Sequence, residues 1–375
     1  MDKISRRFDI IRHVLEKTER NVTTRTANNN NTINPWAILI NHVKLTFFGD
    51  GTMQPLIQHS TIYCLLFVAT HFVNKYVLSV LEFQFPTIFQ GWQTLVGFLM
   101  LSLLGASGHL PSLMVTATRQ DIASWLPGMM LFVASIYSCS KALATLSMPV
   151  FLSLHNLINV IVCIGQVVLF RQMTSVYSYI MLMTVLMSSV LLALNDPDFH
   201  SGGYYWMCVY VFTSGGIALF SKYARGRVKL SAHEKLYCNY LYSVIVLAPS
   251  SYFLGDAVKA GEYPYLFYSK FYIGCIMSGL FGVFLSLCNI KLLELDVDQV
   301  KISHICGLSK LATSVLSLGF FRINVTANSL LFICINQLAA IVCEDCSKLE
   351  QPQEHPLPLH LTQQTLNTRD FIKTM

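Results

Sequence analysis

Ten long apolar stretches dominate this sequence and limit what the chain can fold into. Each has roughly 17 to 22 residues, enough at ~1.5 Å per residue to cross a hydrocarbon core of ~30 Å. The runs do not alternate every second residue, so helices are expected and a β-barrel is not. With 53% hydrophobic and 12% charged residues, the chain is predicted to be an all-α, polytopic membrane protein. The stretches are residues 60–81, 85–106, 122–140, 149–170, 176–194, 203–221, 236–254, 271–289, 303–321 and 327–343.

These stretches contain no Asp or Glu, but two of them contain a lysine, Lys75 and Lys310. A charge at bilayer depth costs at least ~2.5 kcal/mol on insertion scales, so a lysine without a carboxylate on the same segments indicates a functional site. The asymmetry predicts an anionic substrate. It also argues against proton- or sodium-driven transport, in which Asp or Glu normally carries the coupling ion.

The distribution of positive charge predicts the orientation. An even number of spans puts both chain ends on one side, where 20 of the Lys and Arg residues outside the spans fall, against 4 on the other side. The termini are therefore expected to be cytosolic. Residues 1–59 are predicted to be a basic cytosolic tail, 60–343 a transporter domain and 344–375 a disordered cytosolic tail. The cytosolic excess accounts for the net charge of +6, so nucleic-acid binding is not expected.

A short acidic loop at 195–202 divides the spans into two halves, 60–194 and 203–343, of five spans each. Because five is odd, a duplicated five-helix unit inserts in opposite orientations, as in the inverted repeats of secondary transporters. The expected fold is therefore ten transmembrane helices arranged as two inverted five-helix repeats.

Polar residues gather on one face of several spans. At 100° per residue, Asn156 and Asn159 share a side of 149–170, and Lys310 lies on a polar face halfway along 303–321. We expect Lys310 to face a cavity and the two asparagines to offer hydrogen bonds to a polar substrate. Small and hydroxyl residues are also the usual contacts between transmembrane helices, so packing remains an alternative for these stripes. Lys75 lies nearer a helix end, where its stem can also extend to the headgroups.

The sequence lacks signs of catalysis. It has no HExxH, no GxSxG, no phosphate-binding Gly-rich loop and no paired carboxylates within the apolar stretches. Neither enzyme activity nor a cofactor or metal site is expected.

Two short motifs resemble those of the nucleotide-sugar transporters of the drug/metabolite superfamily, nearest to the Golgi GDP-mannose transporters. One is Tyr237-Cys238-Asn239-Tyr240, and the other is Gly307-Leu308-Ser309-Lys310. The resemblance covers roughly residues 60–343. Residues 72–95 and 148–163 are most similar to the transmembrane protein 241 branch of that group.

The resemblance implies roles for individual residues. Lys310, Ser309 and Gly307 match the motif for phosphate and sugar contacts, and Tyr237, Asn239 and Tyr240 match the motif that contacts the base. Ser278 matches a Ser-Gly pair of the eighth span, and Asn74-Lys75 is similar to an Asn-Lys pair of sugar-phosphate carriers. Only Asn239 of the base motif is retained literally, which argues against guanine recognition.

The function implied by this resemblance is a Golgi antiporter that works by alternating access. It would import a nucleotide sugar, with UDP-N-acetylglucosamine as the expected cargo, in exchange for a nucleoside monophosphate. A GDP-mannose transporter, a carrier of phosphorylated metabolites without a nucleobase, and a transport-inactive membrane scaffold remain alternatives. Association into a homodimer is also left open.

Overall fold

The computed structural model describes residues 54–83, 85–110, 117–172, 175–266, 268–294, 299–321 and 323–346. They all belong to the second of the two units into which the chain divides. The tails expected at 1–59 and 344–375 lie outside the described residues, except that the first and last helices extend a few residues into them.

The described residues are helical, and no strand occurs among them. Each predicted apolar stretch coincides with one helix or with two consecutive helices, and the stretch 176–194 has the same bounds as its helix. The helices are α3 (Gln54–Lys75), the π-helix η1 (Tyr76–Val80), α4 (Pro86–Ala106), α5 (Arg119–Thr145), α6 (Met148–His155), α7 (Leu157–Phe170), α8 (Val176–Leu194), α9 (Ser201–Ala224), α10 (Ala232–Phe253), α11 (Asp256–Gly261), α12 (Ser269–Glu294), α13 (Gln299–Phe320) and α14 (Ala327–Cys346).

Polar capping residues mark several helix starts. The Thr118 side chain accepts a hydrogen bond from the Asp121 amide at the start of α5. At α10, Ser231 and Glu234 form a capping box that satisfies two amides reciprocally. Pro86 occupies the first turn of α4, where its missing N–H costs nothing. These signals place the helix starts at the boundaries between polar loops and apolar stretches.

Six segments within the described residues are long and apolar enough to cross a bilayer: Leu56–Val80, Pro86–Ala106, Arg119–Thr145, Met148–Phe170, Val176–Leu194 and Ser269–Glu294. A shorter apolar segment, Ala327–Val342, belongs to α14. The remaining predicted spans coincide with α9, α10 and α13, whose polar and charged residues lower the mean hydropathy of those helices. An all-α, polytopic membrane protein is therefore confirmed, whereas ten crossings remain a prediction.

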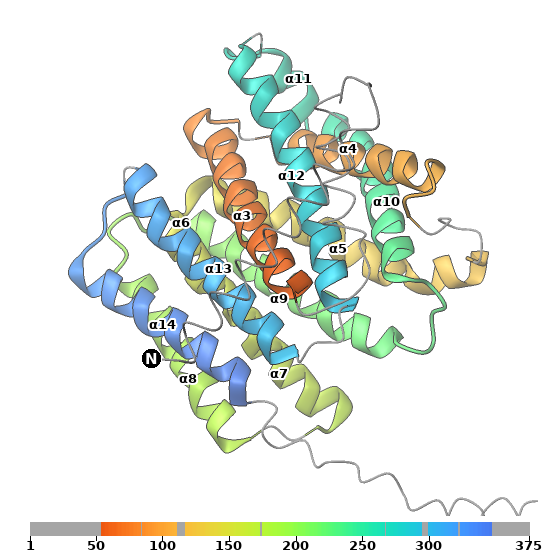
Figure 1. Ribbon diagram of the computed structural model, residues 1–375. Coiled ribbons are helices and arrows are strands. Elements are labelled where there is room, and N and C mark those ends of the chain that lie inside the picture. The colour runs from red at the N-terminus through yellow and green to blue at the C-terminus, as the bar shows by residue number, and fades with distance from the viewer. Residues whose placement is uncertain are drawn as a thin grey trace, which may run out of the picture. The chain divides into compact units, whose positions relative to one another are not determined.

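The helices pack mostly across the two halves of the sequence. In Figure 1, α14 lies beside α8, and α3 lies between α12 and α13. The other main packings join α5 to α9, α4 to α10 and α6 to α13. Helices from both halves thus surround the same interior.

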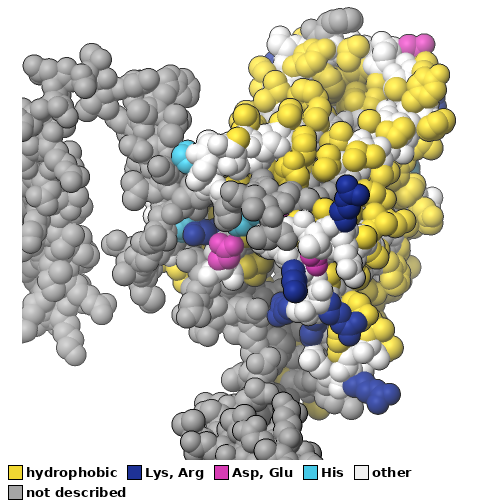
Figure 2. Space-filling view, turned by 90° about the vertical axis from the view of Figure 1, so that its right-hand side faces the viewer, with side chains coloured by type: hydrophobic (Ala, Val, Ile, Leu, Met, Phe, Trp, Pro, Cys, Tyr) yellow, Lys and Arg dark blue, Asp and Glu magenta, His cyan; other side chains and the backbone are white. Residues whose placement is uncertain are grey.

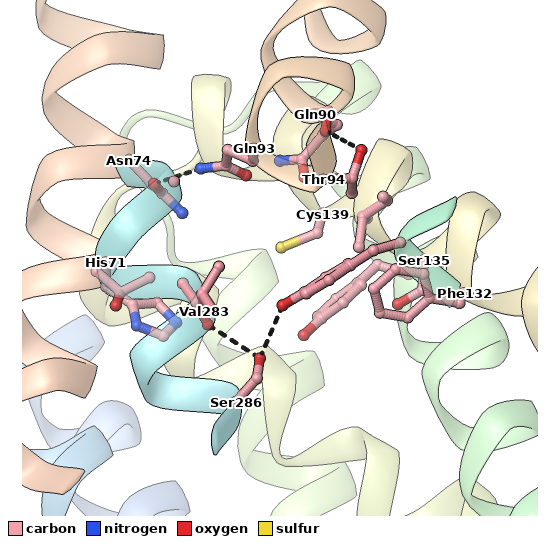
Figure 3. A pocket seen from close by; sticks show the side chains of 16 residues that line it. His71, Asn74, Gln90, Gln93, Thr94, Phe132, Ser135, Cys139, Val283 and Ser286 are labelled. Atoms are coloured by element: carbon pink, nitrogen blue, oxygen red, sulfur yellow. Dashed lines mark hydrogen bonds between the residues drawn. The ribbon is translucent and has the colours of Figure 1, made fainter. Parts of the chain in front are cut away.

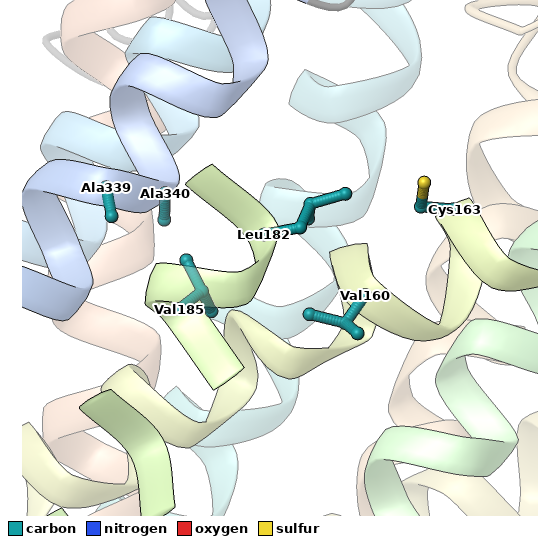
Figure 4. Close-up of a cluster of buried hydrophobic side chains, with 6 residues drawn as sticks. All are labelled: Val160, Cys163, Leu182, Val185, Ala339 and Ala340. Carbon is teal, nitrogen blue, oxygen red and sulfur yellow. The ribbon is translucent and has the colours of Figure 1, made fainter. Parts of the chain in front are cut away.

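The buried apolar core is divided into clusters between helices. One cluster joins α7 and α8 to α14 through Val160, Leu182, Val185 and Ala340 (Figure 4). Figure 2 shows hydrophobic side chains spread over an outer face, with Lys and Arg gathered toward its lower part. A soluble protein rarely exposes such an apolar surface, which here is the surface expected to meet lipid.

Backbone irregularities interrupt two of the predicted spans. The segment 60–81 changes from α-helix to the π-helix η1 directly after Lys75, and π-helical turns occur frequently at functional sites. The segment 149–170 is interrupted at Asn156. The backbone N–H of Asn156 donates to the backbone carbonyl of Ser153, three residues earlier, at 3.1 Å. Both irregularities lie beside buried polar side chains.

Candidate functional site

A polar cavity of about 260 Å³ lies among α3, α4, α5, α9, α10 and α12 (Figure 3). The described residues of its lining include neutral polar and aromatic side chains, and none of them is a Lys, Arg, Asp or Glu. A cavity of this composition can bind uncharged polar groups and stack against flat rings. The polar and aromatic lining residues are Thr70, His71, Asn74, Gln90, Gln93, Thr94, Phe132, Ser135, Tyr210, Tyr240 and Ser286.

One wall of the cavity carries a network of amides. Gln93 Nε2 donates to Asn74 Oδ1 at 3.0 Å and also to the hydroxyl of Ser278. Ser278 Oγ in turn donates to Asn74 Oδ1 at 2.5 Å. Ser278 is fully buried, so it holds the two amides from behind. This network joins α3, α4 and α12.

Aromatic rings cover the opposite wall. Tyr240 of α10 lies 6.1 Å from Phe132 of α5, centroid to centroid, and its hydroxyl donates to Ser286 Oγ at 3.2 Å. A Cβ atom at Gly97 would come within 2.5 Å of the Tyr240 ring, so a glycine is required where α4 passes this ring. Tyr240 is therefore the base-motif residue that the fold brings to the cavity.

Lys310 of α13 does not line the cavity. Its side chain is 8% exposed, and Nζ donates to Asn156 Oδ1 at 3.1 Å. The ammonium also acts electrostatically on His71 and His155. His71 lines the cavity, and His155 Nδ1 lies 3.0 Å from the hydroxyl of Tyr210, another lining residue. The residue predicted to contact phosphate is therefore outside the cavity lining but within electrostatic range of His71, which belongs to it.

Asn156 connects Lys310 to α14. Its Nδ2 donates to Asn336 Oδ1 at 3.0 Å and to Gln337 Oε1 at 3.4 Å. Asn336 then donates to Ser188 and Ser189 of α8. The side chain of Asn156 is therefore a polar hub at the point where the backbone of 149–170 is interrupted.

Three buried polar atoms near this hub have no hydrogen-bond partner among the described residues: Ser153 Oγ, Ser314 Oγ and Gln337 Nε2. They belong to α6, α13 and α14, which are the helices joined by Lys310, Asn156 and Gln337. Unsatisfied polar groups at membrane depth are costly, so hydroxyl and amide groups here can gain hydrogen bonds from a polar ligand.

Lys75 has a different environment. Its side chain is 7% exposed, and Nζ donates to the backbone carbonyls of Leu143 at 2.9 Å and Leu146 at 2.7 Å. These carbonyls belong to the C-terminal end of α5, where the helix dipole is negative. Lys75 neither lines the cavity nor extends outward to solvent.

The other predicted site residues lie outside the cavity lining, in helix contacts. Asn239 Oδ1 accepts the indole N–H of Trp125 at 2.9 Å, and Tyr237 packs on Phe98. Ser309 Oγ donates to the carbonyl of Ile305. A Cβ at Gly307 would meet Ile341 at 2.7 Å, so this glycine permits close packing of α13 on α14.

Asn159 lies one turn from Asn156 on α7 and is half-buried, and it too is absent from the lining. The cavity instead includes residues that the sequence interpretation did not select, above all Gln90, Gln93 and Thr94. They stand at positions i, i+3 and i+4, which lie on one face of the helix α4. A projection of the span 85–106 would have revealed this face.

Comparison with known proteins identifies the family. No protein-family model matches the chain. The chain is 38% identical over 264 residues to the UDP-N-acetylglucosamine transporter TMEM241 homolog of Xenopus laevis, covering 70% of this chain and 88% of that protein. It is 35% identical over 265 residues to the UDP-N-acetylglucosamine transporter TMEM241 of Mus musculus, with the same coverage of 70% and 88%.

A GDP-mannose transporter of Pyricularia oryzae is more distant, at 27% identity over 300 residues, 75% of this chain and 76% of that protein. These relatives are all named as transporters and not as enzymes, in agreement with the prediction from the sequence. The identity to the first two extends over more than two thirds of both chains, and this chain belongs to the TMEM241 family of nucleotide-sugar transporters.

Proposed function

We propose that this protein is a nucleotide-sugar antiporter of the Golgi membrane. It imports UDP-N-acetylglucosamine into the lumen and returns a nucleoside monophosphate, UMP, to the cytosol. Its termini are cytosolic, and its ten spans form two inverted repeats that alternate in opening to either side. The observation that carries this proposal is an aromatic-walled cavity, without a charged side chain in its described lining, together with the buried lysine Lys310 outside that lining.

The charge arrangement suits a substrate with an anionic middle and two uncharged ends. Lys310 provides a positive charge for the phosphates, and charge-assisted hydrogen bonds are roughly twice as strong as neutral ones. Gln337 and Ser314 hold further donors near it. The cavity, free of charged lining residues, receives an uncharged end of the substrate.

Two observations favour a uridine nucleotide over GDP-mannose. The relatives at 35% and 38% identity are named for UDP-N-acetylglucosamine, whereas the GDP-mannose transporter is at 27%. Asn239, the one literal match to the motif that reads guanine, uses its carbonyl oxygen to hold Trp125. The GDP-mannose relatives nevertheless make GDP-mannose the second candidate.

The helix packing supports inverted repeats. If the halves are repeats, the first span corresponds to the sixth, the second to the seventh, and so on. Under this exchange α3 corresponds to α9 and α12 to α5, so the packing of α3 on α12 becomes the packing of α9 on α5. The packings of α4 with α10, α8 with α14 and α6 with α13 each map onto themselves. A two-fold axis that relates the halves produces this pattern, and such an axis is the basis of rocking movements in secondary transporters.

One end of the helix bundle is held closed by bonds between the halves. Tyr263 donates its hydroxyl to the Leu81 carbonyl, and Thr87 donates to Asp256 at 2.5 Å. Phe83 and Phe271 pack at the same end, with ring centroids 4.8 Å apart. By the predicted topology this is the lumenal end, so alternating access requires these contacts to break when substrate is released.

The proposal is tested with purified protein in liposomes preloaded with UMP, with GMP or with buffer. Uptake of labelled UDP-N-acetylglucosamine should require UMP inside, and GDP-mannose should enter poorly under every loading. Efficient uptake of GDP-mannose against GMP would favour the second candidate instead.

A binding measurement separates a transporter from an inactive scaffold. A ligand at a hundred times its dissociation constant stabilises a folded protein by ~2.7 kcal/mol, so UMP should raise the melting temperature. Stabilisation by sugar phosphates but not by UMP would indicate a carrier that does not read the base. A protein that ignores nucleotides and sugar phosphates alike would be a scaffold.

A further inference from the structure

The amide wall of the cavity presents one free donor and one free acceptor side by side. Asn74 Oδ1 receives hydrogen bonds from Gln93 and Ser278, and both described bonds of Gln93 start from its Nε2. In the described part of the chain, no hydrogen bond involves Asn74 Nδ2 or Gln93 Oε1. Both residues line the cavity, and neither is fully buried. The wall therefore offers an N–H and a C=O group to a ligand.

This pair is complementary to a secondary amide. An acetamido group has one N–H donor and one carbonyl acceptor, which can bond to Gln93 Oε1 and Asn74 Nδ2 respectively. Reversing one amide alone would place two amide donors face to face, and reversing both would again leave one free donor and one free acceptor, so the bonds to Ser278 keep the pair complementary to a secondary amide. The fold thus holds the pair ready for an acetamido group before a ligand arrives.

The position of the pair relates it to the sugar end of the proposed cargo. Asn74 lies one turn beyond His71 on α3, and His71 interacts electrostatically with Lys310. A group bound at Asn74 therefore lies on the side of the cavity where the Lys310 charge acts. The rings of Phe132 and Tyr240 lie on the opposite side, as Figure 3 shows for Phe132, and can pack on an apolar face of the same sugar.

The size of the cavity agrees with a subsite for part of a ligand. Pockets that enclose a whole drug-sized molecule measure ~300–1,000 Å³, and this cavity measures about 260 Å³. It accommodates one end of a nucleotide sugar, and the rest of the ligand lies outside it.

We propose that Asn74 and Gln93, held by Ser278, form the subsite that recognises the acetamido group of the sugar and so selects N-acetylated cargo. This assignment rests on the proposed function. It adds the residues that distinguish an acetamido sugar from one carrying a hydroxyl at the same position.

The test is competitive binding to the purified full chain with three probes: UDP-N-acetylglucosamine, UDP-glucose and UMP. Gln93→Met and Asn74→Leu keep side-chain size and remove the hydrogen bonds. Each should weaken UDP-N-acetylglucosamine binding roughly 5- to 10-fold, as expected for one or two neutral hydrogen bonds. The affinity for UDP-glucose should fall less. The affinity for UMP, which lacks the diphosphate-linked sugar, should change by less than about 2-fold.

Folding is checked by the melting temperature with UMP present. Ser278→Ala is a milder variant that leaves both amides in place and should give a smaller loss of the same selectivity. The control is Ser102→Ala on α4. Within the described part of the chain, the Ser102 hydroxyl bonds to the Phe98 carbonyl of its own helix, and the substitution should change none of the three affinities.

An equal loss for all three probes would overturn the assignment, because the pair would then contact the uridine or only support the fold. Unchanged binding of UDP-N-acetylglucosamine would overturn it as well. If the unaltered protein bound neither UMP nor UDP-N-acetylglucosamine, the proposed function itself would fail, which is a separate outcome.

Discussion

Lys75 and Lys310 are both buried lysines within predicted membrane spans, yet the fold uses them differently. The Lys75 ammonium is bonded to two backbone carbonyls at the C-terminal end of α5. The Lys310 ammonium is bonded to a side-chain amide, that of Asn156, which itself joins α6, α13 and α14. Carbonyls of a helix end cannot turn away, whereas an amide side chain can rotate.

The comparison teaches that burial of a charge does not by itself identify a binding residue. A lysine held by main-chain carbonyls stabilises the junction of two helices, as a cation does at a helix C-terminus. A lysine held by a side chain near unpartnered donors can exchange that partner for phosphate oxygens. We therefore expect Lys310 to act on the substrate and Lys75 to act on stability.

The largest expected effect is that of Lys310→Met on exchange. Loss of a hydrogen bond to a charged group costs about 1.5–3 kcal/mol, so UMP affinity and uptake should fall about 10- to 150-fold. Lys310→Arg keeps the charge and should retain part of the activity. Unchanged exchange in Lys310→Met would remove the proposed phosphate contact and with it the distinction between the two lysines.

Lys75→Met should instead lower stability. The substitution leaves two buried carbonyls at the end of α5 without their donor. This should lower the free energy of unfolding by about 1–3 kcal/mol, which is measured as a drop in melting temperature. Its UMP affinity should match that of the unaltered protein. Lys222→Met is the matched control, because Lys222 also lies in the last turn of a helix, α9, but its ammonium bonds to Gln172 in an exposed position, so its stability should change less. Normal stability combined with lost binding in Lys75→Met would restore the substrate contact that the sequence predicted.

Asn156→Asp tests whether Lys310 must change partners. The substitution keeps the shape of the side chain and places a carboxylate beside the ammonium, so an ion pair would compete with the substrate. UMP should bind roughly 10-fold more weakly, equivalent to about 1.4 kcal/mol, and the melting temperature should fall as well, because a carboxylate cannot donate to Asn336 and Gln337 as the Asn156 amide does. Equal affinity would mean that the ammonium does not leave Asn156 when substrate binds.

The smallest expected effect concerns Asn239, which resembles Lys75 in that another part of the fold engages its polar group. Asn239→Leu removes the acceptor of the Trp125 indole and should cost about 1 kcal/mol of stability. The ratio of UMP to GMP affinity should stay constant. A changed ratio would show that Asn239 reads the base after all, as the family motif implies.

Much of the helical layout could be predicted from the sequence because it depends on local composition. The bounds of α8 follow from an apolar run that polar loops end on both sides, and the start of α10 follows from Ser231 and Glu234. The π-helix after Lys75, the interruption at Asn156 and the short α11 were not predicted. The first two accompany bonds to distant helices, which leave no local pattern.

The predicted site residues can be placed in the fold, but their contact with a substrate stays a prediction. Lys310 and Asn156, which lie on polar faces in the sequence, are both buried and bond to each other. The lining residues Gln90 and Gln93 were missed, since a glutamine on an apolar helix has the same appearance whether it faces a cavity or another helix. Asn239 shows the converse, because its motif is retained while its amide is engaged by Trp125.

The sequence by itself determined that this chain lies in a membrane, where its helices fall, and that its apolar stretches carry lysines without carboxylates. These properties are sums over neighbouring residues, and hydropathy and charge express them directly. Only the tertiary structure decided which lysine is held by backbone and which by a side chain, and which amides face the cavity. The reason is that the partners, such as Lys75 with Leu143 and Lys310 with Asn156, are 68 and 154 residues apart and meet only through helix packing.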